Sequence, residues 1–286
     1  MADTWTAWPA PAKLNLFLHI VGRRADGYHL LQTVFQLLDW GDTLRLRVRN
    51  DGRVVRLGGL PGVAPQDDLC VRAARALVDS AKPGLGVDIE LDKRIPMGGG
   101  LGGGSSDAAT VLVALNHLWG GALSIDELAA IGLRLGADVP LFVRGCSAWA
   151  EGVGERLTPI ELAPRRYVIV DPGVAVPTAT LFQVPELTRD TPPATIRAFL
   201  EGMKTTNAFA PVARARFPQV AAALDWLGQY GDARLSGSGG CVFAAVESER
   251  EAENIVRQCP AQFRVWTALG VNRSPLHEAI EKFRAG

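Results

Sequence analysis

A glycine-rich segment that joins a strand-like pattern to a helix-like pattern is the feature that most constrains this chain. It reads Pro96-Met97-Gly98-Gly99-Gly100-Leu101-Gly102-Gly103-Gly104-Ser105-Ser106-Asp107. Glycines permit positive φ and let successive N–H groups face one side, while a following helix adds unpaired amides and the positive end of its dipole. The segment is therefore predicted to bind phosphate, with a glycine hinge or a close-packed turn as the alternative.

The spacing within this segment separates it from two familiar nucleotide loops. Gly98, Gly100 and Gly103 satisfy the loose G-x-G-x-x-G pattern, but a basic stretch and a proline intervene after the strand, so a dehydrogenase site is not favoured. A Walker A loop requires lysine before its Ser or Thr, whereas Gly104 precedes Ser105. Positive charge for the phosphates must therefore come from elsewhere in the chain.

Charge and cysteine content exclude several classes of protein. Thirty Lys plus Arg balance 30 Asp plus Glu, which disfavours binding to nucleic acid or anionic lipid through net charge. The 4 cysteines lack CxxC spacing, so neither a zinc site nor a disulfide framework is expected, and reduced thiols in a cytoplasmic setting fit best. The first residues lack the basic and apolar regions of a signal peptide, and 108–125 is predicted as a buried helix and turn rather than a membrane span.

Hydrophobic periodicity predicts an α+β first segment. Alternation from Leu14 to Ile20 indicates a strand with one buried face, which leaves Lys13 and Asn15 together on the opposite face. The runs 44–48 and 54–57 flank a turn and suggest a hairpin. Helices are expected at 67–81, after the glycine segment, and from a capping box at 124–127 to about 136, with a strand at 87–91.

The pattern restarts after Gly154 as a second α+β layer structure. Strands are expected at 167–170, 241–246 and 263–268, and helical stretches at 195–203, at 212–230 and from Ser248. Two domains are therefore predicted, at 1–158 and 159–286.

Three motifs in order along the chain resemble those of the GHMP small-molecule kinases. They are Pro11-Ala12-Lys13-Leu14-Asn15-Leu16, the glycine segment, and Leu235-Ser236-Gly237-Ser238-Gly239-Gly240-Cys241. The resemblance implies a two-domain fold with an N-terminal ribosomal-protein-S5-domain-2-like part and a C-terminal ferredoxin-like α/β sandwich. It also implies a site in the cleft between the domains.

Two further motifs narrow the resemblance within that superfamily. Arg24-Ala25-Asp26-Gly27-Tyr28-His29 and Gly136-Ala137-Asp138-Val139-Pro140 resemble the members that act on a cytidine-diphosphate-linked methylerythritol. This implies transfer of the ATP γ-phosphate to a 2-hydroxyl, with Mg²⁺, in non-mevalonate isoprenoid biosynthesis. The expected partner is this small molecule, not nucleic acid or a membrane, and the sequence leaves monomer and homodimer open.

The resemblance assigns Asp138 as the base or orienter of the acceptor hydroxyl and Lys13 as the cation beside it. From the residues alone, Asp138 is as readily a turn residue and Lys13 a solvated strand residue. For the nucleotide it implies Lys93 and the segment 96–106, with the hydroxyl of Ser105 or Ser106 available to phosphate or Mg²⁺. Lys93 has the alternative of a surface charge at a strand end.

The resemblance also implies a cytidine site. Tyr28 is expected to stack on the base, Asn15 and His29 to contact the cytidine part, and Phe182, in the segment that begins at Pro177-Thr178, to cover the other face of the ring. Thr178 is included among the substrate residues.

One departure from the family concerns the adenine site, where Asp68 stands in place of the usual asparagine. This puts its contact with adenine in doubt. The loop 236–240 is open between a second anion-binding loop and a tight hairpin.

Three other functions compete with this interpretation. Another kinase of the same superfamily would act on homoserine, mevalonate or a sugar, although the motif at 26–29 favours the cytidine substrate. A non-catalytic nucleotide-binding member would be expected to lack Lys13 or Asp138, and both are present. A module for single-stranded nucleic acid is disfavoured by the zero net charge.

Overall fold

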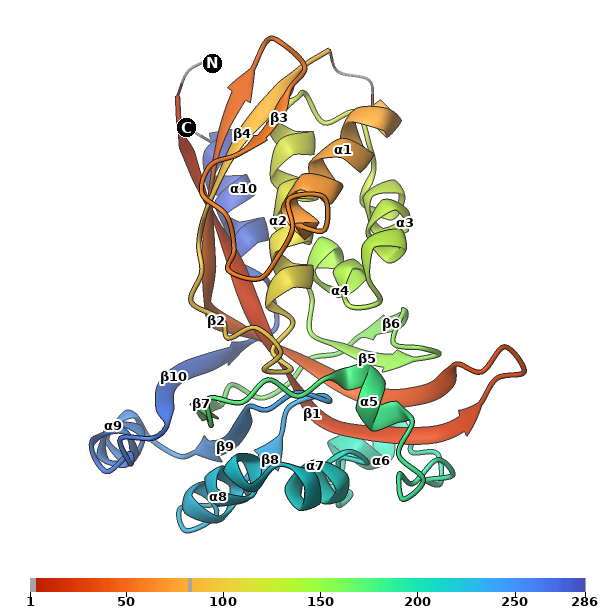
Figure 1. Ribbon diagram of the computed structural model, residues 1–286, viewed down its shortest axis with the longest axis vertical. Helices are drawn as coiled ribbons and strands as arrows, with labels where there is room; N and C mark the ends of the chain where they lie inside the picture. Colours follow the sequence, from red (N-terminus) through yellow and green to blue (C-terminus); the bar gives the residue numbers. More distant parts are fainter. Residues whose placement is uncertain (1–3, 82–83, 286) are drawn as a thin grey trace.

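The computed structural model describes residues 4–81 and 84–285 (Figure 1). The strands are β1 (Thr6–Arg23), β2 (His29–Arg49), β3 (Val54–Arg56), β4 (Gly86–Asp92), β5 (Ala148–Glu151), β6 (Arg156–Pro159), β7 (Arg166–Asp171), β8 (Arg234–Leu235), β9 (Val242–Val246) and β10 (Arg264–Val271). The helices are α1 (Leu69–Ala81), α2 (Gly103–Leu118), α3 (Ile125–Leu135), α4 (Val139–Arg144), α5 (Thr178–Phe182), α6 (Ile196–Leu200), α7 (Ala210–Arg216), α8 (Pro218–Leu227), α9 (Glu249–Arg257) and α10 (Pro275–Ala285).

A mixed sheet runs through the whole molecule in the order β3-β4-β2-β10-β7-β9-β8. The long strands β1 and β2 pair with each other and extend from the upper part of the molecule into the lower part (Figure 1). Helices α1 to α4 belong to the upper part, whereas α7, α8 and α9 lie with β7 to β9 in the lower part. The α+β prediction is therefore confirmed.

In the described parts of the chain, buried side chains form two large clusters and two smaller ones. The first cluster is built from β1, β2, β4 and α1 to α4, and the second from β7, β9 and α7 to α9. Helix α10, at the end of the chain, contributes Leu276 and Ile280 to the first cluster. The small third cluster joins Leu14 of β1 to Leu101 of the glycine segment and Phe243 of β9. The boundary at 158/159 stays a prediction.

Three local predictions are wrong. Both faces of β1 are buried around Leu14, because Lys13, Asn15 and Phe17 are as inaccessible as the leucine. The predicted hairpin of 44–48 with 54–57 does not form: β4 lies between β2 and β3, and β3 is parallel to β4. The helical stretch 212–230 divides into α7 and α8, since Phe217 has extended backbone before Pro218.

The apolar stretch 108–125 provides most of α2 and the turn after it. Along α2 the buried residues run without interruption from Ser106 to Leu115, so the helix is covered on all sides by protein. Over 4–81 and 84–285, no helix combines the length and apolar character that crossing a membrane requires.

Candidate active site

The glycine segment forms a tight loop that enters α2. Gly98, Gly100 and Gly102 have positive φ, and α2 already begins at Gly103, inside the segment rather than after Asp107. Leu101 is buried in the third cluster, and its carbonyl accepts a hydrogen bond from the N–H of Lys13 (3.0 Å). The loop is thereby anchored to β1, and the first N–H groups of α2 have no partner within the helix.

A second glycine loop, 236–240, holds the first one in place. It is the tight turn between the antiparallel strands β8 and β9, which confirms the hairpin alternative. The N–H of Gly240 donates to the Gly98 carbonyl (3.2 Å) and Ser236 Oγ to the Gly100 carbonyl (3.0 Å). A Cβ on Gly100 would lie 2.0 Å from the Ser236 carbonyl oxygen, so the two loops approach more closely than a side chain allows.

The predicted catalytic pair comes together beside these loops. Lys13 Nζ lies 3.6 Å from Asp138 Oδ2 and donates to Asn15 Oδ1 (2.5 Å) and the Gly100 carbonyl (2.9 Å). The lysine side chain is 4% exposed and the aspartate side chain 32% exposed. Burial lowers the pKa of Lys13, and the nearby Asp138 carboxylate opposes that effect. Lys13 is therefore a buried residue paired with Asp138 and not a solvated strand residue.

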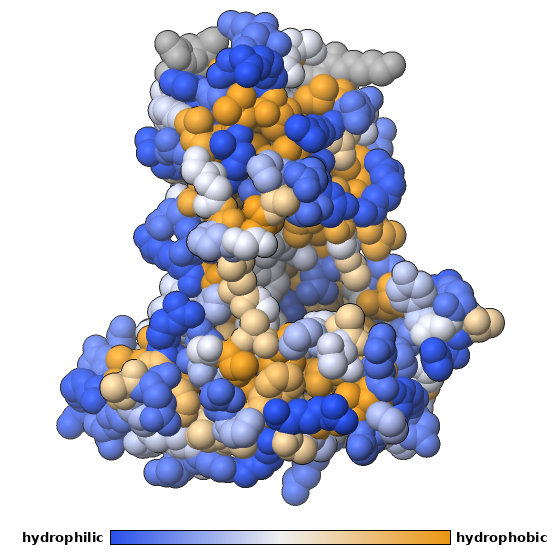
Figure 2. Space-filling model, in the orientation of Figure 1, coloured by the Kyte–Doolittle hydropathy of each residue, from blue (hydrophilic) through white to orange (hydrophobic). Residues whose placement is uncertain are grey.

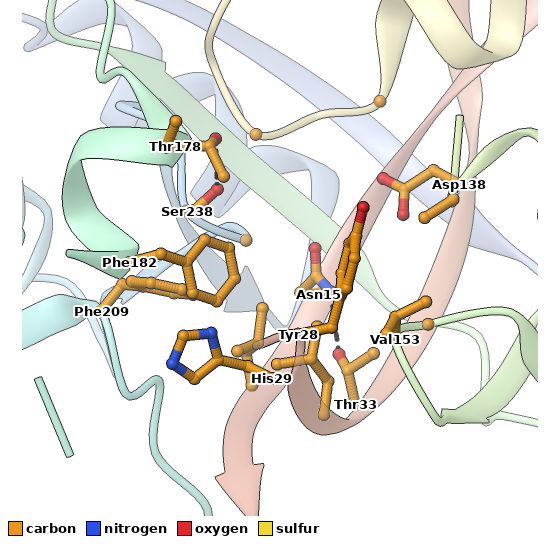
Figure 3. Close-up of a pocket in the computed structure, with 18 of the residues that line it drawn as sticks. Asn15, Tyr28, His29, Thr33, Asp138, Val153, Thr178, Phe182, Phe209 and Ser238 are labelled. Atoms are coloured by element: carbon orange, nitrogen blue, oxygen red, sulfur yellow. Dashed lines mark hydrogen bonds between the residues drawn. The ribbon is translucent and has the colours of Figure 1, made fainter. Parts of the chain in front are cut away.

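A cavity of about 1040 Å³ opens next to this pair. Its lining includes the catalytic pair and all five predicted substrate residues: Lys13, Asn15, Tyr28, His29, Asp138, Thr178 and Phe182. In Figure 3, Phe182 and His29 lie together on one side of this cavity, Tyr28 lies across from them, and Asp138 lies beyond Tyr28. The hollow between the upper and lower parts of the molecule is visible in Figure 2.

The aromatic side of the cavity comes from two distant segments. His29, at the start of β2, stacks on Phe182 at the end of α5, with ring centroids 4.8 Å apart and an angle of 23°. Phe182 also meets the edge of Phe209 (4.9 Å, 89°). Tyr28 is 64% exposed, so its ring is open to a ligand. Thr178 and Ser238 share a hydrogen bond (2.6 Å), which ties α5 to the second glycine loop.

A smaller cavity of about 370 Å³ lies on the other side of the glycine segment. It is lined by 96–105 of that segment together with Asp68, Lys93 and Asp107, and it shares Gly100, Gly102 and Ser105 with the large cavity. The loop therefore separates two ligand-sized spaces. Two such spaces match a donor and an acceptor that meet at the loop.

Lys93 borders the smaller cavity, but two carboxylates already engage its ammonium group. Lys93 Nζ lies 2.5 Å from Asp42 Oδ2 and 2.7 Å from Asp107 Oδ2. Burial lowers the pKa of Lys93, yet Asp107 and Asp42 outweigh burial and raise it overall. Burial raises the pKa of Asp107 to about 7. Lys93 is thus neither a free strand-end charge nor a cation available to phosphate without rearrangement.

Asp68 also borders the smaller cavity in an unusual setting. Its Oδ2 accepts from Arg56 Nε (3.2 Å), its Oδ1 accepts from the Cys70 N–H (2.8 Å), and both charged side chains are less than a tenth exposed. The acid that replaces the expected asparagine is accordingly paired with Arg56, and it accepts a hydrogen bond from an N–H in the first turn of α1.

Arg189 and Asp42 were missed by the sequence analysis. Arg189 lines the large cavity and contacts His29, and Asp42 holds Lys93. Each acts across a long sequence separation, and no local pattern marks either of them. Ser236 lies in the motif 235–241 but was given no individual role there, and its hydroxyl supports Gly100.

Comparison with known proteins agrees with this geometry. The model for the GHMP kinases N terminal domain matches residues 68–146, and the model for the GHMP kinases C terminal matches 193–265. The chain belongs to the GHMP kinase family. The predicted two-domain GHMP kinase fold is confirmed, and membership of this kinase family implies ATP as the phosphoryl donor.

Individual relatives share one description. A protein of Xanthomonas campestris pv. campestris (strain B100), named 4-diphosphocytidyl-2-C-methyl-D-erythritol kinase, is 59% identical over 97% of this chain and 94% of its own length. One of the same name from Halorhodospira halophila is 58% identical over 99% of both chains. A solved structure of 4-(cytidine 5'-diphospho)-2C-methyl-D-erythritol kinase superposes with a TM-score of 0.81 at 35% identity, covering 93% of this chain and 100% of that one.

Proposed function

We propose that this chain is a 4-diphosphocytidyl-2-C-methyl-D-erythritol kinase, which transfers the γ-phosphate of ATP to the 2-hydroxyl of its substrate in non-mevalonate isoprenoid biosynthesis. The observation that carries the proposal is the contact between Lys13 and Asp138 in a cavity that also holds an aromatic pocket and the edge of the glycine loop. The shared name of the relatives supports the substrate.

In the proposed reaction, Asp138 receives the proton of the acceptor hydroxyl. The hydroxyl oxygen bonds to the γ-phosphorus, the bond from that phosphorus to the β-phosphate oxygen breaks, and ADP leaves. Lys13 has three N–H groups, of which two are used by Asn15 and Gly100, so the third is free for Asp138 or a phosphate oxygen. Its positive charge would offset the negative charge on the moving phosphoryl group.

The glycine loop, residues 96–106, would bind the ATP phosphates through main-chain N–H groups at the start of α2. Lys93 and Asp68 would border the nucleotide from the smaller cavity. On the other side of the loop, Tyr28 and Phe182 would enclose the cytosine ring, while Asn15, His29 and Thr178 would supply hydrogen bonds.

Mg²⁺ is part of the proposal, and it would supply positive charge that offsets the negative charge of the phosphates. Within the parts of the chain that the structure describes, no three His, Cys, Asp or Glu side chains form a metal cluster. A magnesium ion held by phosphates, water and one or two protein oxygens fits such a site. Ser105, which lines both cavities, would offer its hydroxyl, whereas Ser106 Oγ is buried and has no hydrogen-bond partner among the described residues. A cytoplasmic location stays a prediction of the sequence.

An ADP-release assay with a panel of acceptors tests the substrate. Purified protein with Mg²⁺ and ATP is offered 4-diphosphocytidyl-2-C-methyl-D-erythritol, mevalonate, homoserine and galactose, and ³¹P NMR identifies the phosphorylated hydroxyl. We expect turnover on the cytidine compound alone, at the 2-position. A higher kcat/KM on any of the other three would refute the proposal in favour of another kinase of the family.

A further inference from the structure

Arg189 connects the two segments that form the aromatic side of the large cavity. Its Nε donates to His29 Nε2 (3.2 Å), although the two residues are 160 positions apart in the sequence. Its terminal nitrogens donate to four main-chain carbonyls that follow α5, those of Phe182 (3.0 Å), Val184 (2.7 Å), Pro185 (3.4 Å) and Leu187 (2.9 Å). One guanidinium group therefore holds the backbone that carries Phe182 and the ring that stacks on Phe182.

The contact with Arg189 determines which ring nitrogen of His29 carries the proton. Arginine is always protonated and its Nε can only donate, so His29 Nε2 has to accept. The proton of the neutral imidazole is then on Nδ1. No other described residue forms a hydrogen bond with Nδ1. His29 consequently offers a single N–H donor to whatever enters the cavity.

The surrounding charges favour the neutral ring. Burial lowers the pKa of His29, and the cations Arg189 and Arg23 lower it further. The acid nearest in sequence, Asp26, pairs with Arg24 (2.8 Å) and is half exposed. A protonated ring would also place a second N–H against the donor of Arg189. His29 is thus neutral at pH 7, in one fixed tautomer.

We propose that Arg189 is a positioning residue that locks His29 as an Nδ1–H donor for an acceptor atom on the pyrimidine ring of a cytidine nucleotide. The inference rests on the proposed function. Cytosine has two adjacent acceptors, N3 and O2, on the edge that a donor in this pocket would meet. In Figure 3, His29 lies next to Phe182 and across from the ring of Tyr28, at the border of the cavity in which a base would stack.

Loss of Arg189 gives an unusual pH dependence. Without it, neutral His29 is free to carry its proton on Nε2, which leaves a bare Nδ1 facing the acceptors of the base. Acid adds a proton and restores the Nδ1–H donor, so binding recovers at low pH. A residue that only supported the loop would, on removal, weaken binding equally at every pH.

The test measures CDP binding by titration calorimetry at pH 8 and pH 6 for the full-length protein and Arg189→Met. We expect binding to weaken by about tenfold at pH 8, the scale of one hydrogen bond and its unpaired partner, and to recover to within about threefold at pH 6. Arg216→Met is the matched control, because Arg216 pairs with Glu186 of the same loop (3.5 Å) and does not touch His29. An equal loss at both pH values overturns the inference.

A second measurement uses the wild-type protein without a ligand, so it does not depend on whether the Arg189→Met variant folds. ¹⁵N NMR of the wild-type protein, with His29 assigned through His29→Gln, reports the tautomer directly. We expect the Nδ1–H form, and an Nε2–H form overturns the inference. Failure of the wild-type protein to bind CDP would count instead against the proposed function, and the NMR result on the Arg189 contact would still stand.

Discussion

The buried carboxylate of Asp107 makes the stability of this chain depend on pH in a direction opposite to that of most acidic groups. Asp107 is 2% exposed, and its Oδ1 has no hydrogen-bond partner in the parts of the chain that the structure describes. One cation, Lys93, lies between the carboxylates of Asp42 and Asp107. Because one of the two negative charges is uncompensated, burial raises the pKa of Asp107 to about 7.

The direction in which stability changes with pH follows from the number of protons that each state binds. An unfolded aspartate has a pKa of about 3.9, so between about pH 4 and pH 7 the folded state binds more protons than the unfolded one. The contribution of Asp107 is therefore fully favourable at low pH and is lost as the pH rises through 7. The folded and unfolded pKa values of Asp107 differ by about three units. At about 1.4 kcal/mol per unit, the stability lost through Asp107 has an upper limit of roughly 4 kcal/mol. Since Asp107 titrates together with its neighbours, we expect about 2 kcal/mol.

Asp107→Asn removes the charge and keeps the shape. The free energy of unfolding is measured by urea denaturation at pH 5, 6, 7 and 8. The variant is expected to exceed the wild type by about 2 kcal/mol at pH 8, and the difference should shrink steadily toward pH 5, because the wild type loses stability progressively between the two pKa values. Asp92→Asn is the control, because Asp92 is the exposed last residue of β4, directly before Lys93, and pairs with Arg94. A variant less stable than the wild type at pH 8, or a difference independent of pH, refutes the reasoning.

Three further predictions concern the proposed site. Lys13→Met should lower kcat at least about a hundredfold, and near-normal turnover in the folded variant would contradict its role. Gly103→Val should raise the ATP requirement, because a Cβ there would lie 2.8 Å from Lys93 Nζ; unchanged ATP affinity by calorimetry would count against the loop as the phosphate site. Tyr28→Ala should raise KM for the cytidine substrate about tenfold with KM for ATP unchanged, and an equal rise in both would argue against stacking.

Local patterns predicted the parts of the fold that depend on neighbouring residues. The capping box at Ser124 is present, with Ser124 Oγ accepting from the Glu127 N–H and the Glu127 carboxylate accepting from the Ser124 N–H. The glycine segment indicated a loop followed by a helix, and only the first helical residue differs. Each of these features depends on residues within a few positions of one another, so periodicity and capping chemistry are sufficient to detect them.

Features that depend on distant pairing could not be predicted in this way. The turn at 50–52 suggested that β2 and β3 pair as a hairpin. Instead, β4 lies between them and pairs with β3 in parallel. The contacts of Arg189 with His29 and of Ser236 with Gly100 each join segments more than 100 residues apart. The neighbouring sequence of a polar residue in such a contact does not differ from that of a solvent-exposed one. Only its burial in the folded chain gives it a structural role.

The shape of β1 explains why Lys13 and Asn15 were assigned to the correct face for the wrong reason. Alternation predicted a regular strand with a solvated polar face, but β1 slips register against β2 between Pro11 and Lys13 and again between Asn15 and Leu18. Such irregularities bend a strand and redirect its side chains. Lys13 and Asn15 stand in the short regular stretch between the two slips, pointing into the cavity, while Leu18 beyond the second slip joins the core of the lower part. Strand β1 packs into the first large cluster before Lys13 and into the second one after it. The ammonium group of Lys13 is therefore held on a strand that both clusters fix, which positions it more precisely than a loop would.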